Sequence, residues 1–288
     1  MDYFFHLAVL CCIYGILAIT LDLVVGRTGM LSIAHAAYYA IGAYAVAILY
    51  GQLHWPFFAA LVAAITISGA VGLVAGLMIS HLEDDFYALS SLAIIILVNS
   101  LAVNWESLTH GTYGIASIGR PAFLGFQLSS DASLFVLSLA LLLIIAAIYH
   151  FVCSSAFGRV LEAIREDEGA IAIFGFDTAH YKLLAYTLSS ALAAVAGGLY
   201  ATFVSYIDPT LFTINESVLI MSMIILGGLA RLRGAVVGAV LITLLPEALR
   251  FVGFPSDIAG HMRYLTYGLV LVFLMRYRPR GVMGAYKL

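Results

Sequence analysis

The chain alternates between long runs of apolar residues and short polar stretches. A bilayer core about 30 Å thick is crossed by a helix of about 20 apolar residues. About nine runs approach this length, at residues 4–21, 31–50, 57–80, 88–103, 134–152, 183–205, 212–229, 235–249 and 264–275. Backbone groups in lipid must be hydrogen-bonded within the chain, so these runs are predicted to be helices. The pattern predicts an all-α, polytopic transmembrane bundle of about eight to ten spans, some of them broken, in one domain over residues 1–288.

Composition supports the membrane assignment. Hydrophobic residues make up 63% of the chain and charged residues 10%, with a mean hydropathy of +1.06. Soluble domains carry about 25% charge, so lipid must surround this protein. The net charge of −3 provides no basic surface for nucleic acid. The first six residues contain no Lys or Arg, so we expect the first apolar run to be a permanent span rather than a cleaved signal peptide.

The distribution of Lys and Arg predicts the orientation, because cytoplasmic loops are enriched in both. The tail after the last run carries Arg276, Arg278, Arg280 and Lys287. The loop 154–182 carries Arg159, Arg165 and Lys182. Both are therefore predicted to lie in the cytoplasm. Counting runs from there places the loops 104–133 and 206–211, and the N-terminus, on the outside. A re-entrant segment near residues 26–30 would reverse the side of the N-terminus.

The chain lacks the motifs of a nucleotide-hydrolysing enzyme. A phosphate-binding loop reads G-x-x-x-x-G-K-[ST], but the two lysines, Lys182 and Lys287, do not follow a glycine. Neither H-E-x-x-H nor G-x-S-x-G occurs. The three cysteines, Cys11, Cys12 and Cys153, do not have metal or redox-motif spacing. We therefore predict no catalytic residues, no metal site and no cofactor in this chain, and a transport role rather than an enzymatic one.

Within the loop 154–182, residues 157–169 predict a short amphipathic helix. Val160, Leu161 and Ile164 form a narrow apolar face, and Gly169 is expected to end the helix. The other positions are mostly charged, namely Glu162, Ala163, Arg165, Glu166, Asp167 and Glu168. Two interpretations remain open from composition alone. The helix is a docking element for a soluble partner, or it lies on the lipid head groups.

Two apolar segments follow glycine- and arginine-containing breaks, one at residues 26–29 and one at residues 227–234. Interrupted helices in two halves of a transporter point to the translocation path, although simple interfacial turns also explain them. The candidate path residues are His35, Tyr38, Asn99, Gly227, Gly228 and Gly234. Ionisable residues in the spans are costly and often functional. For Asp22 we expect instead a pairing with Arg27 at the interface, and for Glu216 a position near a span end.

Four stretches, in order, resemble one known family. They read G-M-L-S-I-A-H-A-A at 29–37, N-W-E-S-L-T-H-G at 104–111, G-R-V-L-E-A-I-R-E-D-E-G at 158–169, and L-G-G-L-A-R-L-R-G at 226–234. With Y-K-L at 181–183 and R-P-R-G at 278–281, the resemblance runs from about residue 20 to residue 282, nearly the whole length of the chain. The chain resembles the permease subunits of high-affinity branched-chain amino acid ABC importers, specifically the M-type subunit.

This resemblance implies partners and a location. The partners would be a second, H-type permease, two cytoplasmic subunits that bind ATP, and a periplasmic or lipoprotein solute-binding protein. The location would be the bacterial cytoplasmic (inner) membrane, crossed several times. Solutes in the family include branched-chain amino acids, urea, amides and aromatic acids. The resemblance also assigns coupling to the ATPase to Val160, Leu161, Glu162, Ala163, Ile164, Arg165, Glu166, Asp167, Glu168 and Gly175.

The alternative is a self-sufficient secondary transporter or channel. Such a protein needs an ion or proton relay inside its spans. Asp22 and Glu216 are the ionisable residues closest to such a position, and they are poor candidates for it.

Overall fold

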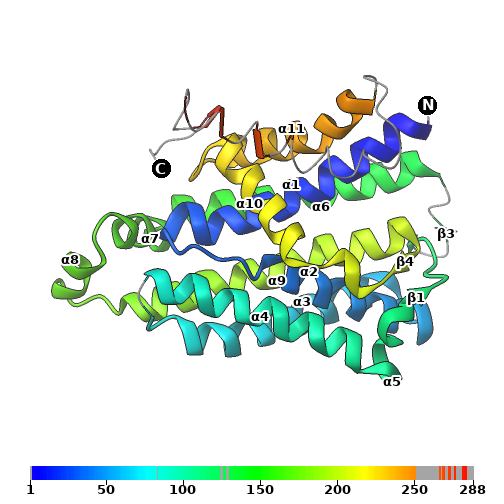
Figure 1. The fold of residues 1–288 in the computed structure, drawn as a ribbon, viewed down its shortest axis with the longest axis horizontal. Coiled ribbons are helices and arrows are strands. Elements are labelled where there is room, and N and C mark those ends of the chain that lie inside the picture. The colour runs from blue at the N-terminus through cyan, green and yellow to red at the C-terminus, as the bar shows by residue number, and fades with distance from the viewer. Residues whose placement is uncertain are drawn as a thin grey trace.

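Long helices run side by side along the longest axis of the molecule (Figure 1). The computed structural model describes residues 2–82, 84–123, 126–127 and 130–250, and then 266, 268–269, 272–273, 276 and 281–283. The major helices are α1 (Asp2–Thr28), α2 (His35–Val46), α3 (Phe57–Ile79), α4 (Asp84–Asn104), α6 (Asp131–Ser154), α9 (Thr178–Val204), α10 (Ile214–Gly227) and α11 (Leu232–Arg250). The smaller ones are η1 (Ala47–Gln52), α5 (Glu106–Thr109), η2 (Gly111–Tyr113), α7 (Ala156–Glu166), α8 (Glu168–Ile173) and η3 (Pro209–Leu211).

The all-α, polytopic prediction is confirmed. Among the described residues, six helical segments are long and apolar enough to cross a membrane. The run 31–50 is shorter as a helix than predicted, because α2 begins only at His35 and turns into a π-helix at Ala47. The chain reaches it through Gly29, whose φ of +80° ends α1. The run 264–275 falls largely outside the described residues.

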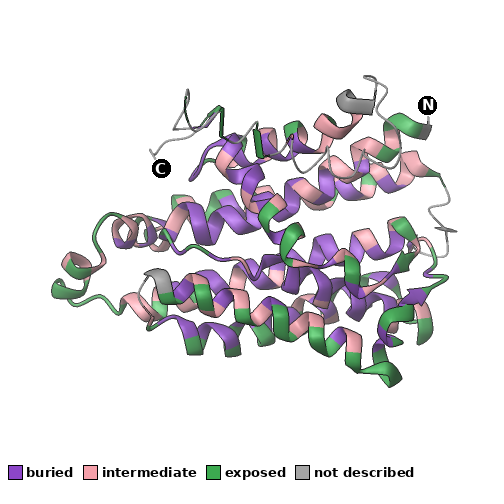
Figure 2. Cartoon of the chain, viewed as in Figure 1, coloured by how far each residue is buried: buried purple, intermediate pink, exposed green. Residues whose placement is uncertain are grey.

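Small residues let the central helices approach closely. A Cβ added at Gly42 or at Gly197 would overlap backbone atoms, those of Ala194 and of Tyr39 and Ala43 respectively. Without a hydrophobic driving force between helices in lipid, such close approach supplies the van der Waals attraction that holds them together. Figure 2 shows the consequence, since α1, α2 and α9 are buried over most of their length whereas α3 and α4 expose long stretches.

The two ends of the bundle differ in structure and charge. One end carries α7 and α8 (Figure 1). Arg159 and Arg165 lie on α7, and ion pairs bring Arg27 to α7 and Lys182 to α8. The opposite end carries the start of α1 and four short strands, β1 (Ile115–Ala116), β2 (Ala122–Phe123), β3 (Phe126–Gln127) and β4 (Tyr206–Ile207). β1 pairs with β4 in antiparallel register. The loops 104–133 and 206–211, predicted to share one side, are therefore in contact.

Candidate functional site

The loop between α6 and α9 folds into two helices rather than one. α7 ends at Glu166, because Asp167 adopts an extended backbone with φ −159° and ψ 97°. The Asp167 carboxylate then accepts a hydrogen bond from the Ala170 backbone N–H at 2.9 Å and so caps the start of α8. The prediction that Gly169 ends the helix is wrong, since Gly169 lies inside α8. Asp167 caps the start of α8, and α7 therefore ends before the chain reaches Gly169.

The apolar face of α7 points into the protein. Leu161 is fully buried and Ile164 is 3% exposed, whereas Val160 is half-buried. Gly158 faces the Cys153 backbone so closely that an added Cβ would meet the Cys153 carbonyl oxygen at 2.5 Å. The face therefore packs on helices of the same chain rather than on lipid head groups. Packing fixes α7 to the bundle.

Polar side chains tie α7 to α1. Glu162 forms an ion pair with Arg27, and the Arg165 guanidinium donates a hydrogen bond to the Gly26 carbonyl oxygen. Among the other predicted coupling residues, Ala163 is half-buried, whereas Glu166, Asp167 and Gly175 are exposed. Both contacts reach the last turn of α1, so a movement of α7 must act on that turn.

A buried polar cluster continues from Arg27 into the membrane-spanning region. Arg27 Nε donates to the Tyr149 hydroxyl at 3.0 Å, and that hydroxyl donates to Asp22 Oδ2 at 2.5 Å. Asp22 Oδ1 accepts from the Ala230 backbone N–H at 2.8 Å. Asp22 is fully buried, and it reaches Arg27 through Tyr149 rather than by the interfacial pairing that the sequence indicated. We call Asp22, Arg27, Tyr149 and Glu162 the inner polar cluster.

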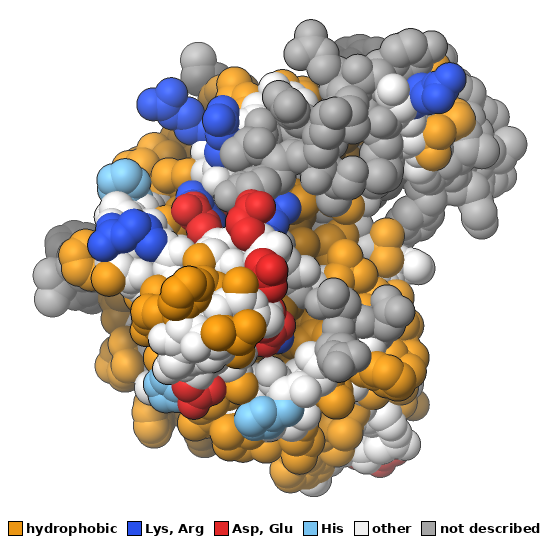
Figure 3. Space-filling model, turned by 90° about the vertical axis from the view of Figure 1, so that its left-hand side faces the viewer, with side chains coloured by type: hydrophobic (Ala, Val, Ile, Leu, Met, Phe, Trp, Pro, Cys, Tyr) orange, Lys and Arg blue, Asp and Glu red, His pale blue; other side chains and the backbone are white. Residues whose placement is uncertain are grey.

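The end of α8 and the turn after it expose apolar residues. Ile173 is 87% exposed, Phe174 78% and Phe176 42%, and we call these three residues the apolar tip. Figure 3 shows hydrophobic side chains at this end of the molecule next to acidic ones, with Lys and Arg side chains beside and above the acidic ones. Glu168 forms an ion pair with Lys182 at 2.5 Å, which ties α8 to α9. Sequence reasoning missed the tip, although three large apolar residues in a loop between charged residues were a signal.

Most of the predicted path residues lie in packed interior. His35 is 3% exposed, with Nε2 2.9 Å from Thr20 Oγ1, and the Tyr38 hydroxyl donates to Tyr186 at 2.9 Å. The glycines of the break serve close contact, because a Cβ on Gly227 or Gly234 would overlap the backbone of the other. Gly228, with φ +107°, makes the turn between α10 and α11.

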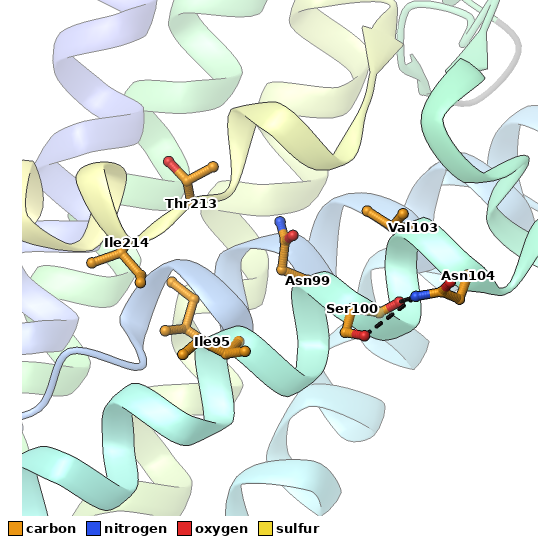
Figure 4. A pocket seen from close by; sticks show the side chains of 8 residues that line it. Ile95, Asn99, Ser100, Val103, Asn104, Thr213 and Ile214 are labelled. Atoms are coloured by element: carbon orange, nitrogen blue, oxygen red, sulfur yellow. Dashed lines mark hydrogen bonds between the residues drawn. The ribbon is translucent and has the colours of Figure 1, made fainter.

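Asn99, by contrast, lines an open groove. The groove has a volume of about 400 Å³ and lies between α4 and the segment that leads into α10. Its lining residues are Ile95, Ile96, Asn99, Ser100, Val103, Asn104, Thr213 and Ile214. Figure 4 shows Asn99 pointing from α4 toward the segment that carries Thr213. Glu216 lies in the first turn of α10 and accepts a hydrogen bond from Tyr14 at 2.8 Å, so it does not line the groove.

Comparisons with known proteins agree with this architecture. The model of the family described as "Branched-chain amino acid transport system / permease component" matches residues 3–275. The chain is 30% identical to the high-affinity branched-chain amino acid transport system permease protein LivM of Salmonella typhimurium, over 96% of this chain and 69% of the relative. It is 25% identical to the corresponding permease protein LivH of Escherichia coli K12, over 94% of this chain and 91% of the relative.

A more distant relative is the probable branched-chain amino acid transport permease protein LivM of Methanocaldococcus jannaschii, 26% identical over 77% of this chain and 68% of the relative. No solved structure matches the chain. The family match covers nearly all of the described bundle, including α7, α8 and the groove. This chain is a multi-pass membrane protein and a transport component rather than an enzyme, and it belongs to the family of branched-chain amino acid transport system permease components.

Proposed function

We propose that this chain is the transmembrane permease subunit of an ATP-driven importer in the bacterial cytoplasmic membrane. Its solutes are branched-chain amino acids or related small polar molecules, as the names of its relatives support. A second homologous permease completes the pathway, two cytoplasmic subunits bind and hydrolyse ATP, and an external solute-binding protein delivers the solute. The chain itself binds no nucleotide.

The arrangement of α7 and α8 is the observation that carries this proposal. α7 is held to the bundle by buried apolar side chains and by the Arg27–Glu162 ion pair. α8 projects from the bundle (Figure 1) and exposes the apolar tip to solvent. An element that is rigidly attached on one side and apolar on the other is suited to dock a soluble partner. The cytoplasmic assignment of this end is supported by its Lys and Arg residues.

The inner polar cluster provides a route by which a movement of the ATPase subunits reaches the membrane-spanning helices. When ATP draws the two ATPase subunits together, the docked tip moves, and α7 transmits the movement to the end of α1 through Glu162 and Arg165. Tyr149 and Asp22 then connect the end of α1 to Ala230, in the break between α10 and α11. ATP shifts the permease between outward and inward openings only through its different affinity for the two states.

Replacing Phe174 tests the docking step in the assembled transporter. Burying a phenylalanine side chain contributes about 1.5–3 kcal/mol, so we expect Phe174→Ala to weaken ATPase binding about 10- to 100-fold. The matched control is Phe151→Ala, because Phe151 on α6 is 76% exposed but lies outside the tip. Co-purification of the ATPase subunits and solute-stimulated ATP hydrolysis are the measurements. Equal results for both variants would contradict the docking role.

Charge exchange tests the transmission step separately. We expect Arg27→Glu and Glu162→Arg to reduce solute-stimulated ATP hydrolysis, with the ATPase subunits still bound, because each leaves two like charges facing one another. The double variant restores an ion pair of the opposite polarity, and its stimulation should recover in part. If the double variant is no better than the single ones, the ion pair does not transmit the movement.

A further inference from the structure

The groove beside α4 has one wall made of a single helical face. Ile95, Ile96, Asn99, Ser100, Val103 and Asn104 follow the spacing i, i+1, i+4, i+5, i+8 and i+9. At 1.5 Å per residue, this face extends about 14 Å from the outer end of α4 into the span. Ser100 and Asn104 are exposed on it, and Asn99 is half-buried.

Contact with lipid is unfavourable for this face of α4. Of the six apolar segments in the described chain, α4 is the least buried, with 22% of its apolar window inside the protein. Its exposed side chains must therefore meet lipid, water or another protein. Amides and hydroxyls facing hydrocarbon are costly because water is absent there. Asn104 Nδ2 already donates to the Ser100 carbonyl oxygen at 2.7 Å and lies 3.3 Å from the Ser100 hydroxyl oxygen. The exposed side chains of both residues nevertheless favour contact with water or with a polar protein surface over contact with lipid.

The other wall is a break in a membrane-spanning segment. Residues Pro209–Gly227 form one candidate span, but its helix is interrupted between η3 and α10 at Phe212 and Thr213. Asn99 Nδ2 donates to the Pro209 carbonyl oxygen at 2.8 Å and lies 3.4 Å from that of Phe212. Non-helical backbone at membrane depth is tolerated where it lines a cavity or is buried in protein. Interrupted spans of this kind form substrate sites in transporters.

The groove has the chemistry for a small aliphatic solute without net charge. Its volume of about 400 Å³ falls within the usual range of small-molecule sites. Isoleucines and a valine offer contacts to an alkyl chain, and the amide oxygen of Asn99 and the hydroxyls of Ser100 and Thr213 offer neutral hydrogen-bonding groups. The lining contains no charged residue. Passage requires binding that is favourable enough for entry and weak enough for release, and a lining of neutral groups suits this requirement.

From these observations we infer that the α4 groove is the outer part of the translocation path contributed by this chain. Its open side is closed by the second permease, and a zwitterionic aliphatic amino acid passes along it. This inference rests on the proposed function and locates the path on a surface of the chain rather than in its interior.

Two neighbouring residues at the same depth provide a matched test. Ile96 is 50% exposed and lines the groove, whereas Leu97 is 58% exposed and lines an apolar recess between α2, α3 and α4. Each is changed to cysteine in a variant whose Cys11, Cys12 and Cys153 are replaced by alanine, within the assembled transporter. A membrane-impermeant thiol reagent should label Ile96→Cys from outside, and leucine should slow that labelling. Leu97→Cys should stay unlabelled.

Tryptophan at the same two positions tests passage. We expect Ile96→Trp to fill the groove and lower leucine import at least tenfold, and Leu97→Trp to leave import within twofold of the parent. If Ile96→Trp blocks assembly with the second permease, the cysteine labelling still tests whether the groove is part of the path. Equal labelling, or equal import, at both positions in a working transporter overturns the inference about the groove and leaves the proposed function intact. A transporter that never assembles or never uses ATP contradicts the proposed function instead.

Discussion

Two groups of polar side chains extend into the membrane-spanning region of this protein, and their environments are opposite. The inner polar cluster is closed, since Asp22 is fully buried and both of its oxygens accept hydrogen bonds. The α4 groove is open, and Ser100 and Asn104 face outward. Polar groups inside a membrane need partners. The closed group finds all of these partners within the chain and connects helices. In the open group Asn99 and Asn104 also donate to carbonyl oxygens of the chain, but the side chains of Ser100 and Asn104 remain exposed to a partner or a solute.

The largest expected effect comes from removing the carboxylate of the closed group. Asp22→Ala leaves the Ala230 N–H and the Tyr149 hydroxyl without their acceptor, at about 1–3 kcal/mol for each unsatisfied group. We expect the free energy of unfolding in detergent to fall by about 2–6 kcal/mol. Asp22→Asn is the control and should cost less, because its oxygen keeps one of the two hydrogen bonds. A stable Asp22→Ala variant would show that the cluster is not closed.

Gly26→Ala should have the next largest effect, because it places a methyl group inside the same cluster. The added Cβ would overlap Asp22 Oδ1 and come within 2.8 Å of the Ala230 backbone nitrogen. Overpacking of this kind costs about 1–3 kcal/mol, measured as a lower thermal midpoint. Gly169→Ala is the matched control, since its Cβ meets nothing nearer than 3.4 Å. If Gly169→Ala lowers the thermal midpoint as much as Gly26→Ala does, the loss of stability does not come from overpacking of the cluster.

Lys182→Met should act locally on α8. The Lys182 side chain is 7% exposed and its partner Glu168 is 41% exposed, so the ion pair lies at the edge of the bundle. We expect a change of at most about 1 kcal/mol in global stability. Amide hydrogen exchange over residues 168–177 should become several-fold faster, while α7 remains protected. Lys182→Arg should keep the exchange slow, and identical exchange in both variants would mean that the ion pair does not hold α8.

The smallest effect on stability is expected in the open group. Ser100→Ala removes one exposed hydroxyl, and the change in unfolding free energy should stay within about 0.5 kcal/mol. The same measurement on Asp22→Ala provides the comparison. If Ser100→Ala destabilises the isolated chain as strongly as Asp22→Ala, the groove is part of the packed core and its proposed role is lost.

Of the six candidate path residues predicted from the sequence, one lines a groove and five lie in the packed interior. Tertiary contacts explain this difference. His35 and Tyr38 follow a glycine-containing break, as path residues do, but both are buried, His35 against Thr20 of α1 and Tyr38 against Tyr186 of α9. Whether a polar residue in an apolar helix faces a groove or a packed interior depends on the neighbouring helix. That neighbour is far away along the chain, as the pair Asn99 and Pro209 shows.

The sequence by itself determined the features that depend on local pattern and composition. Apolar runs predicted the helical bundle, the absence of a phosphate-binding loop excluded ATP hydrolysis by the usual P-loop route, and the spacing of Leu161 and Ile164 predicted the buried face of α7. Only the tertiary structure decided that Asp22 meets Tyr149 and Ala230, that Ile173 and Phe174 project as a tip, and that α4 borders a groove. The physical reason is that a polar group in a membrane is defined by its partners, and here those partners lie more than a hundred residues away.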